Sequence, residues 1–150
     1  MSDVIRLTMN AIRSFAIFVT LLSVGCNYSS SGTDIDDPRA WTWAFDEPRP
    51  SDGVTVNRSR YWSSSHFTAE YVWHFDLSLT DEAVAELLSN PDIERVDTAQ
   101  SVDDLVLERP AWFLPDGESG YTAYRFNKSS SFVMYVNAET GRSFWSAWQL

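Results

Sequence analysis

The chain has little sulfur and little positive charge. Its 150 residues include one cysteine, Cys26, so no intrachain disulfide can form and the fold must rest on a packed core. Basic residues number 11 against 21 acidic residues, which gives a net charge of −10. Contacts to phosphate groups need clusters of lysine and arginine. The charge balance therefore argues against a nucleic-acid partner and against docking of the protein surface onto anionic lipid.

Long apolar runs are also missing. The uncharged segment from Ser14 to Gly25 has 12 residues, which as a helix would span about 18 Å against about 30 Å of bilayer hydrocarbon. The segment is too short to cross the bilayer as a helix. Arg6 and Arg13 precede the segment and the small residue Gly25 ends it. This layout is typical of an export signal, which we place at residues 1–25.

The run Leu22-Ser23-Val24-Gly25-Cys26 resembles the lipobox of bacterial lipoproteins, although Ser23 stands where that family most often has leucine. The resemblance implies cleavage between Gly25 and Cys26, a diacylglyceryl group on the Cys26 thiol and acylation of the new amino group. Asn27 follows the cysteine, where aspartate would favour the inner membrane of a Gram-negative host. We therefore expect the outer membrane. An ordinary secretory signal or an uncleaved helix is the alternative.

The remaining chain divides into a tether and one domain. Residues 26–40 are small, polar and acidic, as in a lipidated N-terminus followed by a flexible tether. Residues 41–150 suffice for a single globular domain. Residues 1–25 hold two arginines and one aspartate, so the mature chain keeps 9 basic and 20 acidic residues, a net charge of −11.

Apolar and polar residues alternate along 67–79, which predicts a strand with one buried face and one face in solvent. At Thr80 the period changes to that of a helix, with the cap at Thr80 and the end at Asn90-Pro91. A weaker helix is expected from Ser101, before Pro110.

Further strand patterns cover the two ends of the domain. Segments 121–127, 131–137 and 142–149 are separated by short turns and predict a run of hairpins, while 41–45 and 54–62 could add one or two further strands. We therefore predict an α+β fold, an antiparallel sheet (meander) with one or two helices packed on one face.

The candidates for catalysis are few. His66 and His74 would lie about 27 Å apart along one strand, too far to share a metal ion. His74 and Asp76 share one face and could orient an imidazole as a base for a serine nucleophile. However, the chain has no Gly-x-Ser-x-Gly elbow, and a solvated strand face offers the same residues. We predict no catalytic residue, no metal and no cofactor.

Aromatic residues make up 15% of the chain, with seven tryptophans. They could build the core or form an exposed platform for a protein or glycan. The best platform candidate is Trp112-Phe113 with Arg109 beside it, because Pro110 and Pro115 could hold both rings outward. Packing of these rings over the end of a helix is the other interpretation, and of the two it is the one that we favour. Trp148 lies on the strand parity opposite to Trp145, so it is a further candidate for partner binding.

These features predict a non-catalytic, lipid-anchored envelope protein that binds a protein partner at the periplasmic face of the outer membrane. An acidic domain attracts a basic target such as a lysozyme-like hydrolase, so an inhibitor or immunity protein is one form of this function. Ser119-Gly120-Tyr121 resembles a short loop motif of membrane-bound lysozyme inhibitors. A cell-envelope hydrolase and a glycan-binding module are the alternatives, and the oligomeric state stays open.

Overall fold

The computed structural model describes residues 29–30, 36–64, 70–96, 101–126 and 131–150. The expected export signal, Cys26 and His66 lie outside these residues. The strands are β1 (Ser29–Ser30), β2 (Val54–Ser63), β3 (Tyr71–Leu79), β4 (Ile93–Arg95), β5 (Thr122–Phe126), β6 (Val133–Val136) and β7 (Arg142–Gln149). The helices are α2 (Pro38–Phe45), α3 (Asp81–Ser89) and α4 (Val102–Leu105). The predicted α+β class is confirmed.

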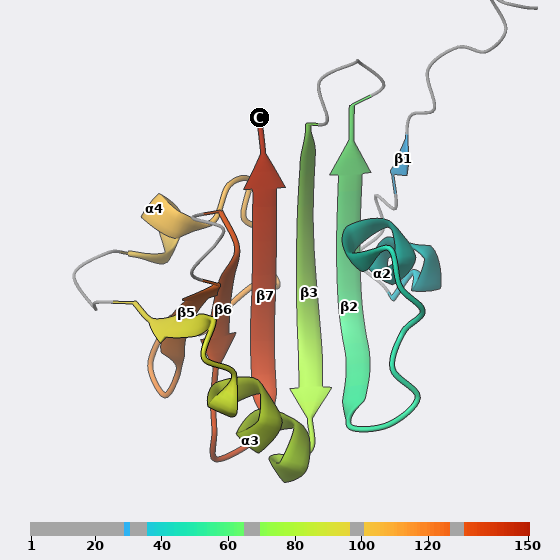
Figure 1. Cartoon of the computed structure of the whole chain (residues 1–150). Helices are drawn as coiled ribbons and strands as arrows, with labels where there is room; N and C mark the ends of the chain where they lie inside the picture. The colour runs from blue at the N-terminus through green and yellow to red at the C-terminus, as the bar shows by residue number, and fades with distance from the viewer. Residues whose placement is uncertain (1–28, 31–35, 65–69, 97–100, 127–130) are drawn as a thin grey trace, which may run out of the picture.

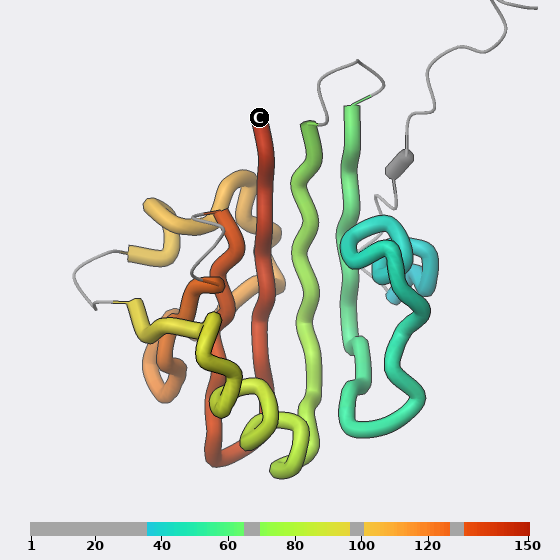
Figure 2. Tube along the Cα trace, in the orientation of Figure 1, coloured from blue at the N-terminus to red at the C-terminus, as the bar shows by residue number. Residues whose placement is uncertain are grey.

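The seven strands within the described residues form one antiparallel sheet in the order β1-β2-β3-β7-β6-β5-β4 (Figure 1). Strands β5 to β7 form a meander of hairpins, as expected, and β4, which the sequence pattern did not predict, pairs with β5 at the edge. The chain leaves the centre of the sheet after β3, and α3 carries it to the opposite edge at β4. Figure 2 shows the result, with β7 lying between β3 and β6.

The strand predicted at 41–45 is wrong, because these residues lie in helix α2. The Asp37 side chain accepts a hydrogen bond from the backbone N–H of Arg39, and Pro38 occupies the start of the helix. Both are favourable at a helix N-terminus, and they outweigh the alternating pattern of the tryptophans. Trp41 and Phe45 then lie one turn apart, with ring centroids separated by 4.5 Å. The helix also includes residues 38–40, which we had expected in the tether.

The face of the sheet that carries Trp73, Phe75 and Leu77 of β3 is called the first face. Helices α2 and α3 cover it, on the near side of the sheet in Figure 1. Thr80 caps α3 as predicted, through a hydrogen bond to its side chain from the N–H of Ala83. The larger hydrophobic core, which is rich in aromatic rings, lies between these helices and the sheet.

The opposite, second face of the sheet carries His74 and Asp76 of β3. We expected this face to be in solvent, and that expectation is wrong: both side chains are only 1% exposed. The irregular segment after α4 folds over the strands and buries them, because it contributes apolar residues of its own. A second core cluster results, made of Val102, Leu105, Val106, Trp112, Phe113, Leu114, Val133, Tyr135 and Phe144.

None of the helices within the described ranges is both long enough and apolar enough to cross a bilayer.

Candidate functional site

The predicted partner-binding residues lie at the second face, but the rings point inward. Phe113 is 0% exposed and Trp112 is 7% exposed. The outward platform is therefore wrong, and the rings pack with α4 against the sheet, in agreement with the packing that we favoured. Arg109 is exposed, with its Nε 3.0 Å from Oδ1 of Asp103. Trp148 is half-buried, opposite Val72 of β3.

His74 and Asp76 do not form a catalytic unit. Nδ1 of His74 lies 3.0 Å from Oγ of Ser146, whereas the Asp76 carboxylate binds Arg142 and Asn57. Burial lowers the pKa of His74 to about 3, and the nearby positive charge of Arg60 contributes to the lowering. A buried, neutral imidazole of this kind has no access to a substrate, so its interactions are structural.

In the ranges that the structure describes, no three side chains of His, Cys, Asp or Glu are grouped closely enough to hold a metal ion.

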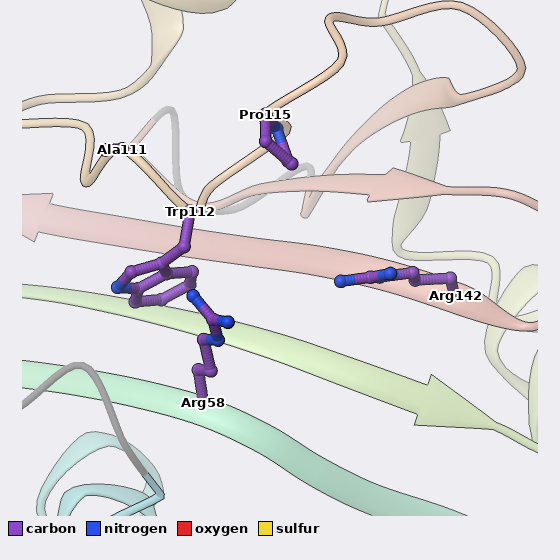
Figure 3. Close-up of a pocket in the computed structure, with 5 residues that line it drawn as sticks. All are labelled: Arg58, Ala111, Trp112, Pro115 and Arg142. Atoms are coloured by element: carbon purple, nitrogen blue, oxygen red, sulfur yellow. The ribbon is translucent and has the colours of Figure 1, made fainter.

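A cleft of about 400 Å³ opens on the second face (Figure 3). Three separate parts of the chain build it: β2, the segment after α4, and β7. Its walls are formed by Arg58, Ala111, Trp112, Pro115 and Arg142. Its size is at the lower end of the range for small-molecule sites.

A β-bulge places the first arginine. The register of β2 against β3 shifts between Val56 and Arg58, which leaves Asn57 as an extra residue. The side-chain amide of Asn57 donates to Oδ1 of Asp76 at 3.1 Å, on the second face. Arg58 pairs directly with Asp76 across the two strands, yet the structure gives no ion pair between them. The carboxylate is already bound by Asn57 and Arg142, so the exposed guanidinium of Arg58 extends into the cleft (Figure 3).

A buried carboxylate orients the second arginine. Nη2 of Arg142 lies 2.9 Å from Oδ2 of Asp76, and Nε lies 3.3 Å from Oδ1. This two-point contact fixes the plane of the guanidinium and leaves Nη1 outside the pair. Figure 3 shows the guanidinium pointing toward Trp112 and Arg58. The Arg142 side chain is 48% exposed, so a ligand in the cleft can reach it.

Residues 101–118, called the acidic loop, form the outer side of the same region. Their five acidic residues are exposed, and Arg109 is the one basic residue among them. Three of the carboxylates have local roles: Asp104 caps α4, Asp103 pairs with Arg109, and Glu118 accepts a hydrogen bond from the N–H of Val102.

Sequence reasoning identified the acidity of the chain but missed Arg58 and Arg142. In the sequence, the only sign of their role is that each is a charged residue within a predicted strand. Neither the bulge nor the cleft can be inferred from that.

Comparison with known proteins gives no relative: the chain matches no protein-family model, no curated protein and no solved structure at a significant level.

Proposed function

We propose that this chain is a lipid-anchored, non-catalytic binding domain at the periplasmic face of the outer membrane. In this proposal the acyl groups on Cys26 hold the protein in the membrane, and the folded domain captures a basic protein. An inhibitor of a basic cell-wall hydrolase is the form of this function that we favour.

One observation carries the proposal: the acidic loop is fixed to the sheet while its carboxylates face solvent. Phe113 and Leu114 are at most 1% exposed and anchor the loop in the second core cluster. Glu108 and Asp116 are exposed. A rigid surface loses little conformational freedom on binding, which favours affinity.

The charge distribution gives this surface its selectivity. A field from clustered carboxylates raises the association rate of a cationic protein by about 10- to 1000-fold, and salt reduces the effect. At physiological ionic strength the field of an exposed charge falls off over about 8 Å. The contact must therefore form close to the acidic loop.

The experiment is a binding titration of the purified protein with a basic muramidase of the lysozyme type. We expect binding at low salt that weakens steeply as salt is added, together with loss of muramidase activity. Cytochrome c, a basic protein without muramidase activity, serves as the probe for charge alone. Absence of muramidase binding at low salt would contradict the proposal, and equal binding of cytochrome c would contradict the inhibitor form.

Two double variants that each remove two negative charges test whether the basic protein binds at the acidic loop. The double variant Glu108→Gln/Asp116→Asn removes two charges from the acidic loop, and Glu82→Gln/Glu86→Gln removes two from α3, which packs on the first face of the sheet. We expect the first to slow association by roughly threefold or more and the second to have little effect. Equal effects of the two would mean that net charge, and not this loop, governs binding.

The hydrolase alternative has less support, because His74 and Ser146 are buried beneath the loop and Asp76 is paired with Arg142. The half-buried Trp148 is compatible with the glycan-binding alternative, but one such ring does not distinguish it.

A further inference from the structure

Both charged residues that line the cleft on the second face are arginines, although the domain is strongly acidic. Asp76 offsets the charge of one guanidinium, that of Arg142. Arg58 lies beside this pair, and the structure gives it no carboxylate partner among the described residues. Arg60, two residues along the same strand, adds a further positive charge on this side and helps to keep His74 neutral. The lining of the cleft therefore offers two cationic groups and no carboxylate, while Asp116 of the acidic loop also acts electrostatically on Arg142.

The two arginines present hydrogen-bond donors to the same space. Nη1 of Arg142 lies outside the contact with Asp76, and the guanidinium points into the cleft. The guanidinium of Arg58 enters from β2, on the other side of β3 from Arg142, and lies next to the ring of Trp112 (Figure 3). Planar guanidinium groups match the paired oxygens of carboxylates and phosphates.

The rest of the wall is apolar. Trp112, Pro115 and Ala111 line it, and the indole ring of Trp112 is held in place by the second core cluster. A fixed aromatic surface beside a positive charge favours a ligand that has both a flat or apolar part and an anionic group.

We propose that this cleft is a binding site for a small oxyanion ligand, a carboxylate or phosphate attached to a ring. Arg58 and Arg142 bind the oxygens, and Trp112 packs against the ring. Asp76 acts as a positioning residue for Arg142. The cleft shares Ala111, Trp112 and Pro115 with the acidic loop, but its ligand is bound through Arg58 and Arg142, so the proposal does not depend on the basic partner proposed above.

The test is a chemical-shift titration of the whole protein with small probes. Benzoate and phenyl phosphate carry the ring and the anion, benzamide carries the ring without the charge, and acetate and inorganic phosphate carry the charge without the ring. We expect saturable shifts of the Trp112 indole N–H with at least one of the first two. Comparison of the two distinguishes a carboxylate ligand from a phosphate ligand.

The variants Arg58→Gln and Arg95→Gln are a matched pair. Both remove one exposed arginine charge, but Arg95 lies on β4 at the far edge of the sheet. We expect Arg58→Gln to weaken binding by about tenfold, since a charge-assisted hydrogen bond is lost. Arg95→Gln should leave binding unchanged. Thermal unfolding of both variants verifies that they are folded.

Three results would overturn the proposal: no saturable shift with either ring-bearing anion, equal binding of benzamide, or equal weakening by the two variants. If acetate and inorganic phosphate bind as tightly as the ring-bearing probes, the contact with Trp112 adds no affinity. That result would overturn the proposed ligand class.

Discussion

Oγ of Ser146 lies 3.0 Å from Nδ1 of His74, on the neighbouring strands β7 and β3, and both side chains are almost fully buried. The ring of Phe113 covers the imidazole, with a centroid distance of 5.7 Å. Nε2 of His74 has no hydrogen-bond partner among the described atoms. The ring is therefore held neutral in an apolar environment, and adding a proton to it opposes folding.

Acid should destabilise the protein through His74. Its pKa is about 3 in the folded protein, against 6.5 for the ordinary side chain, because burial disfavours the charged ring. The unfolded chain binds the proton first, so the stabilisation is complete above pH 6.5 and is lost as the pH falls toward 3. Between pH 6.5 and 5 we expect the free energy of unfolding to fall by about 1 kcal/mol per pH unit. Denaturant titrations across this range measure it.

The variant His74→Gln is the comparison for this effect, since it keeps a polar group at the site and cannot be protonated. Its stability should change much less between pH 6.5 and 5. An equal slope for both proteins would rule out His74 as the source.

Removing only one partner of the Arg142–Asp76 pair should lower the free energy of unfolding more than removing both. Arg142→Met leaves the buried Asp76 carboxylate without its cation, and we expect a loss of about 2–3 kcal/mol in the free energy of unfolding. Adding Asp76→Asn should restore part of that loss, because the uncompensated charge disappears. Urea unfolding of the single and double variants tests this. A double variant less stable than Arg142→Met would contradict the explanation.

The turn before β7 should tolerate no side chain at Gly141. This residue has φ +69°, and a Cβ there would collide with the backbone carbonyl of Leu79. Gly117 has a similar φ of +82° but open space around it. We therefore expect Gly117→Ala to cost about 1–2 kcal/mol, the price of the left-handed conformation, and Gly141→Ala to cost clearly more. Thermal unfolding compares them, and equal losses would show that the collision is relieved easily.

Lipid attachment should depend on Cys26. Mass spectrometry of the exported protein should show a chain that begins at Cys26 and carries acyl groups, and the protein should fractionate with membranes. Cys26→Ser should abolish both, whereas Ser23→Leu should preserve processing because leucine is usual at that lipobox position. A free thiol on the exported protein, or retention of residues 1–25, would disprove the anchor.

Much of the sheet follows from local pattern. The alternation along β3 and the change of period at Thr80 predicted both the strand and α3, because each buries its apolar residues at the spacing of its own backbone. Helix α2 was missed although Asp37-Pro38 is a recognisable helix start. The spacing of Trp41 and Trp43 suggested a strand. The segment is a helix because this conformation packs the aromatic rings into the core on the first face.

The second face could not be predicted in the same way. His74 and Asp76 have the spacing of solvent-facing residues, and they are buried by a segment some 40 residues later in the chain. Trp112, Phe113 and Leu114 do this without any periodic pattern. The cleft also depends on the bulge at Asn57 and on the register of β7, which are long-range properties.

The central place of β7 in the sheet has a consequence for synthesis. A nascent chain made only as far as β6 leaves β3 and β6 each with an unpaired edge, since residues 142–149 join the two halves. The pairing of β3 with β7 thus joins segments that are made at widely separated times, which slows folding and exposes strand edges to aggregation. A polypeptide released before residue 149 would be unable to complete the sheet, so premature termination should yield insoluble or degraded product.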